Sequence, residues 1–162
     1  MDRAEYVRTV ETYANDIYRV AFCYCRNKSD AEDIVQSVFL KLLQAEQEFQ
    51  DELHKKKWLL RVTANQAKDF CASYWKQKVV SMETVTTEMG AFMKAEEANA
   101  LYEAVMSLSS KYRPVVHLYY YEDYSVKEIA EILNIKETAV QTRLMRARQK
   151  LKNVLEEAWQ DE

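Results

Sequence analysis

Residues 125–151 read SVKEIAEILNIKETAVQTRLMRARQKL, and this stretch decides the fold of the C-terminal half of the chain. Ser125 is followed three positions later by Glu128, which predicts a capping box, the reciprocal hydrogen-bonding pattern that begins a helix. Asn134 tolerates the left-handed backbone conformation that ends a helix, and a second helix can start within three residues. Two short helices joined by so tight a turn are typical of a helix-turn-helix. The apolar residues expected to point inward from the first helix are Val126, Ile129, Ala130 and Leu133.

The second helix of this stretch has distinct sides when its residues are spaced at about 100° each. One side is apolar and should face the core; it consists of Val140, Leu144, Ala147 and Leu151. The opposite side carries groups able to reach base edges, namely Thr138, Gln141, Thr142 and Met145. Cations line both flanks, with Arg143, Arg146 and Lys150 on one and Arg148 and Lys152 on the other. Such a helix fits the major groove of DNA, and a solvated amphipathic helix is the alternative.

Basic and acidic residues are concentrated in different segments of the chain, which the net charge alone does not show. The total is −3, yet residues 136–152 hold six basic residues and one acidic residue. Residues 54–78 hold seven bases and one acid, whereas residues 30–52 hold seven acids and one base, and residues 81–107 hold five acids and one base. Two basic patches between acidic segments suit a protein that touches a polyanion at two places. Ordinary solvated helix faces are the alternative.

Glycine and proline each occur once among the 162 residues, as Gly90 and Pro114, which argues against strand-and-turn architectures. We therefore expect an all-α chain of two small helical domains joined by a linker, the second containing the helix-turn-helix. The first domain covers residues 1–78, the linker residues 79–95, and the second domain residues 96–162.

Three amphipathic helices are expected in the first domain. Ser29 should cap the second of them, because the carboxylates that follow in the first turn favour the positive end of the helix dipole. The third should span about residues 58–75, after a loop. Together the three helices make a plausible bundle.

The composition offers no catalytic constellation. Three cysteines without a C-x-x-C pair and two histidines without a partner at helical spacing give no disulfide framework and no metal site. The sequence contains neither a Gly-rich phosphate loop nor a G-x-S-x-G elbow, so we expect neither an enzyme nor a bound cofactor. No apolar run approaches ~18 residues and the N-terminus does not resemble a signal peptide. We therefore expect a cytoplasmic protein without membrane insertion.

Three segments follow one another along the chain: SDAEDIVQSVFLKLL, WLLRVTANQAKDF and LSSKYRPVVHLYYYEDYSVKEIAEILNIKETAVQTRLMRARQKL. In this order they resemble the core-binding helix, the −10 reading helix and the −35 reading domain of a bacterial sigma factor. The two-domain, extracytoplasmic-function type of the sigma-70 family fits best, over nearly the whole chain. The resemblance implies a factor that binds core RNA polymerase, reads two elements of promoter DNA to direct transcription initiation, and is controlled by an anti-sigma factor.

The resemblance also implies a surface that docks on the coiled-coil clamp helices of the largest polymerase subunit. Its residues would be Asp33, Gln36, Ser37, Phe39 and Leu43. The periodicity agrees in part, because one apolar face of this helix is formed by Ala31, Val35, Val38 and Leu42. Asp33, Gln36 and Leu40 lie opposite, with Phe39 at the margin, which suggests a protein partner; a helix buried all round is the alternative. Ser37 stands where the family usually has an acidic residue.

For the −10 element, the resemblance points to the third helix and the loop before it. The helix would contribute Arg61, Asn65 and Lys68, and the loop EFQDELHKKK would contribute Lys55, Lys56 and Lys57. Family members capture a flipped base here, and Asn65 matches the base-contacting position. An unpaired base needs an amide and a flat wall, while lysines hold the strand. Trp58 is either that wall or a core residue.

For the −35 element, the resemblance assigns base reading to the outward face of the last helix, through Gln141, Thr142, Met145 and Arg146. The flanking cations Arg143, Arg148 and Lys150 would contact phosphates. Lys136 and Gln141 differ from the residues common in the family, so we expect weaker binding and a different preferred sequence.

Two other functions remain open. A stand-alone helix-turn-helix regulator would bind palindromic DNA as a dimer without polymerase. An adaptor would use its basic helices to bind acidic partners and would show no salt-sensitive DNA binding. The first alternative leaves the exposed residues of the docking helix without a role.

Overall fold

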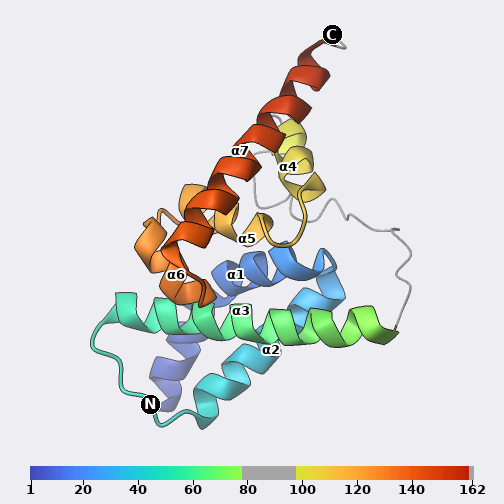
Figure 1. Cartoon of the computed structure of the whole chain (residues 1–162). Coiled ribbons are helices and arrows are strands. Elements are labelled where there is room, and N and C mark those ends of the chain that lie inside the picture. Colours follow the sequence, from blue (N-terminus) through green and yellow to red (C-terminus); the bar gives the residue numbers. More distant parts are fainter. Residues whose placement is uncertain (78–97, 161–162) are drawn as a thin grey trace. The chain divides into compact units, whose positions relative to one another are not determined.

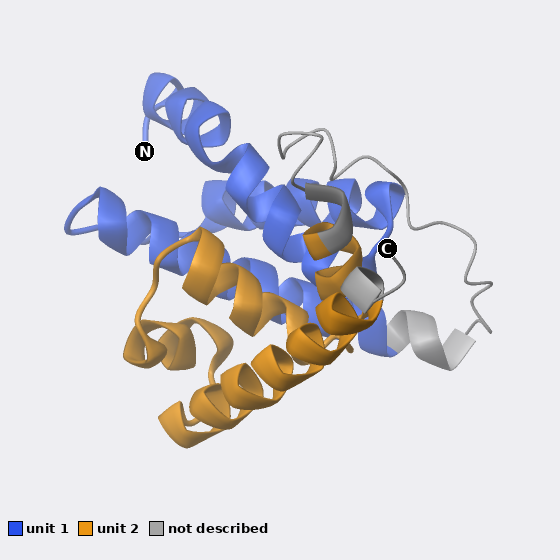
Figure 2. Cartoon of the chain, turned by 90° about the horizontal axis from the view of Figure 1, so that it is seen from above, with its two compact units in different colours: residues 1–84 blue, residues 85–162 orange. Residues whose placement is uncertain are grey.

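The computed structural model describes residues 1–77 and 98–160, and every regular element within them is a helix (Figure 1). The chain divides into two compact units, residues 1–84 and residues 85–162 (Figure 2). The prediction of an all-α chain with two helical domains is confirmed. The predicted linker, residues 79–95, lies outside the described residues.

Unit 1 is a bundle of three helices, α1 (Arg3–Cys25), α2 (Lys28–Gln44) and α3 (Glu52–Gln77). Each helix packs against the other two. Burying a large apolar side chain contributes about 1.5–3 kcal/mol, so mutual packing rather than helix propensity stabilises the bundle. The largest side chains fully buried in this core are Ile17, Val20, Phe22, Val38, Leu59 and Leu60.

The turn between α1 and α2 is short and is closed by two local hydrogen bonds. Arg26 adopts the left-handed conformation, with φ 52° and ψ 31°, and its N–H bonds the carbonyl of Phe22 to end α1. Asn27 Oδ1 then accepts the N–H of Asp30 at 3.0 Å and caps α2. The prediction that Ser29 caps α2 is wrong, because the short turn brings Asn27 into the capping position and Ser29 already lies in the first turn.

The start of α3 also differs from the prediction. The helix begins at Glu52 rather than near residue 58, because Asp51 Oδ1 accepts the N–H of His54 at 2.7 Å and caps it. Residues 55–57 therefore lie on the helix and not in the preceding loop. The apolar periodicity of this segment is weak, so the sequence pattern alone did not locate its first turn.

Unit 2 contains α4 (Ala98–Ser107), α5 (Arg113–Val116), the π-helical turn η2 (His117–Tyr121), α6 (Val126–Leu133) and α7 (Glu137–Gln160). α7 packs against α4, α5 and α6 and is the central element of the unit. One buried cluster joins α7 to the segment before α6; it consists of Leu108, Tyr112, Val116 and Ala147.

The local signals of the helix-turn-helix are confirmed. Ser125 Oγ accepts the N–H of Glu128 at 3.1 Å, and Glu128 Oε1 accepts the N–H of Ser125 at 3.2 Å. Asn134 ends α6 in the left-handed region, with φ 54° and ψ 51°. Ile132 is buried although it was not expected to be, whereas Val126 is only half-buried.

The helix that begins at Arg113 changes its pitch. α5 passes into η2, in which the N–H of Glu122 bonds the carbonyl of His117 at 3.2 Å. A π turn accommodates one extra residue and is uncommon. Pro114 lies in the first turn of α5, where its missing N–H is tolerated. The wider turn leaves Tyr120 exposed.

Ser125→Ala should lower the free energy of unfolding of unit 2 by about 1 kcal/mol, because the N–H of Glu128 loses its acceptor. Ser125→Asp retains an acceptor at the cap and is the matched control. Urea denaturation followed by circular dichroism measures both variants. Equal midpoints for Ser125→Ala and the wild-type chain would contradict a stabilising cap.

Candidate polymerase and nucleic-acid interfaces

The outward side of α2 carries an apolar stripe next to polar groups. Leu40 is 54% exposed and Leu43 is 62% exposed, and Asp33 and Gln36 are exposed on the same side. These four residues follow helical spacing, so they form one continuous face. The alternative of a helix buried all round is therefore wrong. We call these four residues the α2 face.

Two residues predicted for docking do not belong to the α2 face. Phe39 is only 6% exposed, because α2 packs against both α1 and α3 and its buried side is wider than one stripe. Tyr6 on α1 donates a hydrogen bond to the carbonyl of Phe39 at 3.1 Å. Ser37 is half-buried and donates to Gln66 Oε1 on α3 at 2.8 Å. We therefore assign Phe39 and Ser37 to the packing of unit 1.

The described part of α3 presents a polar stripe to solvent. Arg61, Asn65 and Lys68 are all exposed and lie one turn apart, so the structure brings these three predicted residues together. An amide between two cations can hydrogen-bond a base edge while its neighbours hold phosphates. We call these three residues the α3 stripe.

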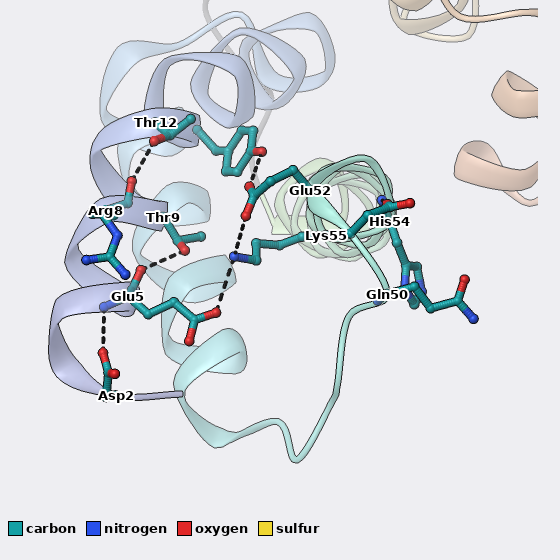
Figure 3. A network of polar contacts seen from close by, with 11 residues as sticks. Asp2, Glu5, Arg8, Thr9, Thr12, Gln50, Glu52, His54 and Lys55 are labelled. Atoms are coloured by element: carbon teal, nitrogen blue, oxygen red, sulfur yellow. Dashed lines mark hydrogen bonds and ion pairs between the residues drawn. The ribbon is translucent and has the colours of Figure 1, made fainter.

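Lys55 is buried and does not belong to the exposed α3 stripe. It is 5% exposed, and its Nζ lies 3.1 Å from Glu52 Oε1 and 3.4 Å from Glu5 Oε1 on α1 (Figure 3). Tyr13 on α1 donates to Glu52 Oε2 at 2.7 Å. These contacts tie the first turn of α3 to α1. The prediction placed Lys55 in a DNA-contacting loop, and the loop is wrong because Lys55 lies on α3. Its ammonium group pairs with Glu5 and Glu52 within unit 1. Lys56 and Lys57 are half-buried on the same turn.

The same network shifts two acid–base equilibria. Burial and the hydrogen bond to Glu52 raise the pKa of Tyr13 to about 12. Hydrogen bonds from Tyr13 and Lys55 lower the pKa of the Glu52 carboxyl. Each shift favours a protonated phenol beside a charged carboxylate, which is the state that the hydrogen bond requires.

The loop before α3 is held by contacts that the sequence reading missed. His54 Nδ1 accepts the N–H of Gln50 at 3.1 Å, and Asp51 caps the helix. The ring of Phe49 meets the rings of His54 and Trp58 edge-on, each at a centroid distance of 5.5 Å. Trp58 is half-buried, so it is neither an open wall nor a sealed core residue.

The three sides predicted for α7 are present. Val140, Leu144 and Ala147 are buried, and Leu151 is half-buried. The opposite side is open to solvent; it includes the exposed residues Thr138, Gln141, Met145 and Arg146 and the half-buried Thr142. Thr142 donates its hydroxyl proton to the carbonyl of Thr138 at 2.9 Å, so that donor is already used. We call this side the α7 face.

The flank of α7 that carries Arg148 is seated on two tyrosines of η2. Arg148 Nε donates a short hydrogen bond to the hydroxyl of Tyr120, and the guanidinium lies 5.4 Å from the Tyr119 ring and 5.6 Å from the Tyr120 ring. These contacts raise the pKa of Arg148. Cation–π contacts of this kind restrict the position of the charge without neutralising it. The tyrosine run YYY was not assigned a role from the sequence.

Within residues 1–77 and 98–160, no cluster of three histidine, cysteine or acidic side chains could hold a metal ion. In the same ranges, no helix has the length and apolar character needed to cross a bilayer. Cys23, Cys25 and Cys71, which all lie in the described residues, form no disulfide, and burial raises the pKa of Cys25 to about 12.

Two family models match the two units separately. Sigma-70 region 2 matches residues 9–77, and Sigma-70 region 4 matches residues 98–151. RNA polymerase sigma factor SigV of Bacillus subtilis (strain 168) is 31% identical over 145 residues, which cover 90% of this chain and 87% of SigV. ECF RNA polymerase sigma factor SigW of the same strain is 27% identical over 169 residues, covering 95% of this chain and 90% of SigW.

Two solved structures share the fold. Sigma factor RpoE of Bartonella quintana, in complex with the anti-sigma factor NepR, superposes with a TM-score of 0.73 at 21% identity and covers 94% of this chain and 97% of its own. CnrH, in complex with the cytosolic domain of CnrY, gives a TM-score of 0.67 at 21% identity, covering 96% of this chain and 90% of its own.

Phe39→Ala should destabilise unit 1 by about 3–5 kcal/mol, because it leaves a cavity between α2 and its neighbours. Leu43→Ala truncates an exposed side chain of the same helix and should change the free energy of unfolding by less than about 0.5 kcal/mol. Urea denaturation compares the two variants. A Phe39→Ala chain as stable as Leu43→Ala would mean that Phe39 is not a core residue.

The stability of unit 1 should fall at alkaline pH through Tyr13. The pKa of this phenol rises from 10.0 to about 12 on folding, so the unfolded chain releases the proton first. Stability that is fully present below pH 10.0 is then lost as the pH rises toward 12. Tyr13→Phe removes this titration and should lose less stability over the same range. Urea midpoints on both sides of pH 10.0 measure it, and parallel curves for the two chains would contradict the linkage.

Proposed function

The chain belongs to the sigma-70 family of RNA polymerase sigma factors, in its extracytoplasmic-function group, and we propose that its two units divide promoter recognition between them. Unit 1 would bind core RNA polymerase and the −10 element, and unit 2 would bind the −35 element. Sigma factors are regulatory initiation factors rather than enzymes. The phosphodiester chemistry would belong to the polymerase, in the cytoplasm.

The α2 face would dock on the clamp helices of the largest polymerase subunit. Its two leucines project from a helix whose other side is sealed by α1 and α3, so they are available to a partner without disturbing the fold. Exposed apolar side chains on a helix fit the groove of a partner coiled coil. Polar contacts from the neighbouring Asp33 and Gln36 would fix the orientation of that partner on the helix. This face is the observation that carries the proposal, because a helix-turn-helix regulator working alone has no use for it.

The α3 stripe would hold the separated strand of the −10 element. Asn65 offers both a donor and an acceptor to the edge of an unpaired base, and Arg61 and Lys68 lie on either side of it for the phosphates. The preceding loop, held by His54 and Phe49, lies at the start of the same helix and would form the rest of the base pocket. Lys55 has no part in this contact.

The α7 face would enter the major groove of the −35 element. Gln141 can pair in a bidentate manner with adenine, and Met145, which is 59% exposed, can contact the methyl group of thymine. Arg146, Arg148, Arg143 and Lys150 would contact the backbone on both flanks and set the register of the helix.

An anti-sigma factor would regulate the chain. Two proteins of the same fold, RpoE and CnrH, are known in complexes, the first with the anti-sigma factor NepR and the second with the cytosolic domain of CnrY. We extend this to the present chain on the ground that its exposed apolar and cationic faces would otherwise bind polymerase and DNA at all times. The α2 face and the α7 face are the surfaces that such a partner would cover.

Leu43→Ala should weaken binding to purified core RNA polymerase about tenfold, because truncating a central apolar anchor commonly costs more than 1 kcal/mol. Leu53→Ala is the matched control, since Leu53 is 63% exposed on α3 and lies outside the α2 face. Fluorescence anisotropy of the labelled chain measures both affinities.

Run-off transcription over a promoter library tests the function as a whole. The wild-type chain with core enzyme should initiate selectively, and Arg146→Ala should bind core normally but lose promoter selection. Equal core affinity for Leu43→Ala and Leu53→Ala would show that the docking face is misplaced. Failure of the wild-type chain to confer selective initiation would refute the function itself.

A further inference from the structure

The loop between α2 and α3, residues 45–51, is joined to the first turn of α3 by two reciprocal hydrogen bonds. Asp51 Oδ1 accepts the N–H of His54 at 2.7 Å, and His54 Nδ1 accepts the N–H of Gln50 at 3.1 Å. The pattern resembles a capping box in which an imidazole replaces the usual carboxylate or amide and accepts from the residue before the cap. His54 therefore fixes the backbone of Gln50 relative to α3.

The same imidazole also holds the neighbouring residue of the loop. The ring of Phe49 meets the ring of His54 edge-on at a centroid distance of 5.5 Å, and it meets the ring of Trp58 at the same distance. Edge-on contacts are favourable because the positive edge of one ring faces the negative face of the other. Residues 46–48 have exposed side chains, so the contacts of Phe49 and Gln50 are where the loop meets α3.

The contacts of His54 are separate from the buried polar network at the start of α3. Glu52 and Lys55 point toward α1, whereas His54 and Gln50 lie on the other side of the helix (Figure 3). A substitution of His54 should therefore leave the contacts of Lys55 with Glu5 and Glu52 in place. The shape of the loop can be altered without detaching α3 from α1.

His54 lies on the same side of α3 as the α3 stripe. It precedes Arg61, Asn65 and Lys68 by seven, eleven and fourteen positions, and at about 100° per residue these spacings return to within about 40° of the same direction. About three helical turns separate His54 from Asn65. A single strand that runs along the stripe therefore reaches the loop at the start of the helix.

We propose that His54 is a positioning residue for the −10 element, which holds the loop of residues 45–51 in the shape that selects one unpaired base of the strand on the α3 stripe. The inference rests on the proposed function of that stripe. The imidazole acts through the backbone of Gln50 and the ring of Phe49 rather than by touching the base. Discrimination between bases needs contacts that are held in place before binding, so a loosened loop should accept several bases with similar affinity.

Two variants of the full chain separate the hydrogen bond from the ring. His54→Phe keeps an aromatic ring beside Phe49 and removes the acceptor for the N–H of Gln50. His54→Asn removes the ring and keeps an acceptor, because the amide Oδ1 occupies the position of the imidazole Nδ1. Asn27→Ala is the matched control: it removes the cap of α2, a bond of 3.0 Å in the same unit, at the end of α2 opposite the loop.

Open-complex formation with purified core polymerase measures the effect, on promoters that share one −35 element and carry each single-base change in the −10 element. His54→Phe should lower the discrimination at one −10 position about fivefold, which corresponds to the loss of one hydrogen bond of about 1 kcal/mol. His54→Asn should restore most of that discrimination. Asn27→Ala should keep the wild-type base preferences, and every variant should bind core polymerase with wild-type affinity.

The outcomes separate the positioning role from the function. If His54→Phe keeps the wild-type preferences, or weakens opening equally on every promoter as a loss of stability would, His54 does not position a base-selecting loop. If His54→Asn is as defective as His54→Phe, the acceptor is not what matters and the inference is wrong. If the wild-type chain itself shows no preference among the −10 sequences, it is the proposed function of the α3 stripe that fails.

Discussion

The apolar stripe of α7 is the constraint on which the rest of unit 2 depends. Val140, Leu144 and Ala147 must be buried against α4, α5 and α6, and that burial fixes the rotation of the helix about its axis. Side chains on a helix keep fixed angular positions. The burial of one side therefore also sets the directions of the opposite face and of the two cationic flanks. The capping box before α6 and the left-handed Asn134 after it then fix the direction in which α7 leaves the turn. The burial of this apolar stripe thus determines which groups of α7 are exposed.

Unit 1 differs, since one of its helices carries exposed apolar side chains on one side and still packs into the bundle on the other. α2 achieves this by packing against α1 and α3 together, so that Phe39 is sealed while Leu40 and Leu43 remain outside. The polar network of Tyr13, Glu52, Lys55 and Glu5 fastens the first turn of α3 to α1. A buried ammonium that is paired in this way carries a desolvation cost, so its value lies as much in orientation as in stability. The loop that precedes α3 therefore ends at a helical turn that these contacts hold against α1.

The charged side chains are also unevenly distributed along the chain. Cations that face outward on α3 and α7 are concentrated where a phosphate backbone could lie, and acidic segments elsewhere in the chain bring the net charge to −3. Tyrosines from the segment before α6 hold these cations at defined positions, with Arg148 on Tyr119 and Tyr120 and Lys150 on Tyr112. Aromatic faces hold a cation without cancelling its charge, which leaves it available to an anion. A carboxylate in the same place would have neutralised it.

The amino-acid sequence by itself determined the helical class, the helix-turn-helix and the outward face of α7, because these depend on contacts between residues three or four positions apart. Ser125 with Glu128, and Asn134 at the helix end, are signals of this local kind. The tertiary structure alone decided that Phe39 is a core residue, that Lys55 pairs with carboxylates and that His117 begins a π-helical turn. Lys55 meets Glu5 across fifty positions of sequence, and Ser37 meets Gln66 across twenty-nine. A helical period shows which side of a helix is apolar, but how wide a band is buried depends on how many neighbours pack against it, and only the folded chain supplies them.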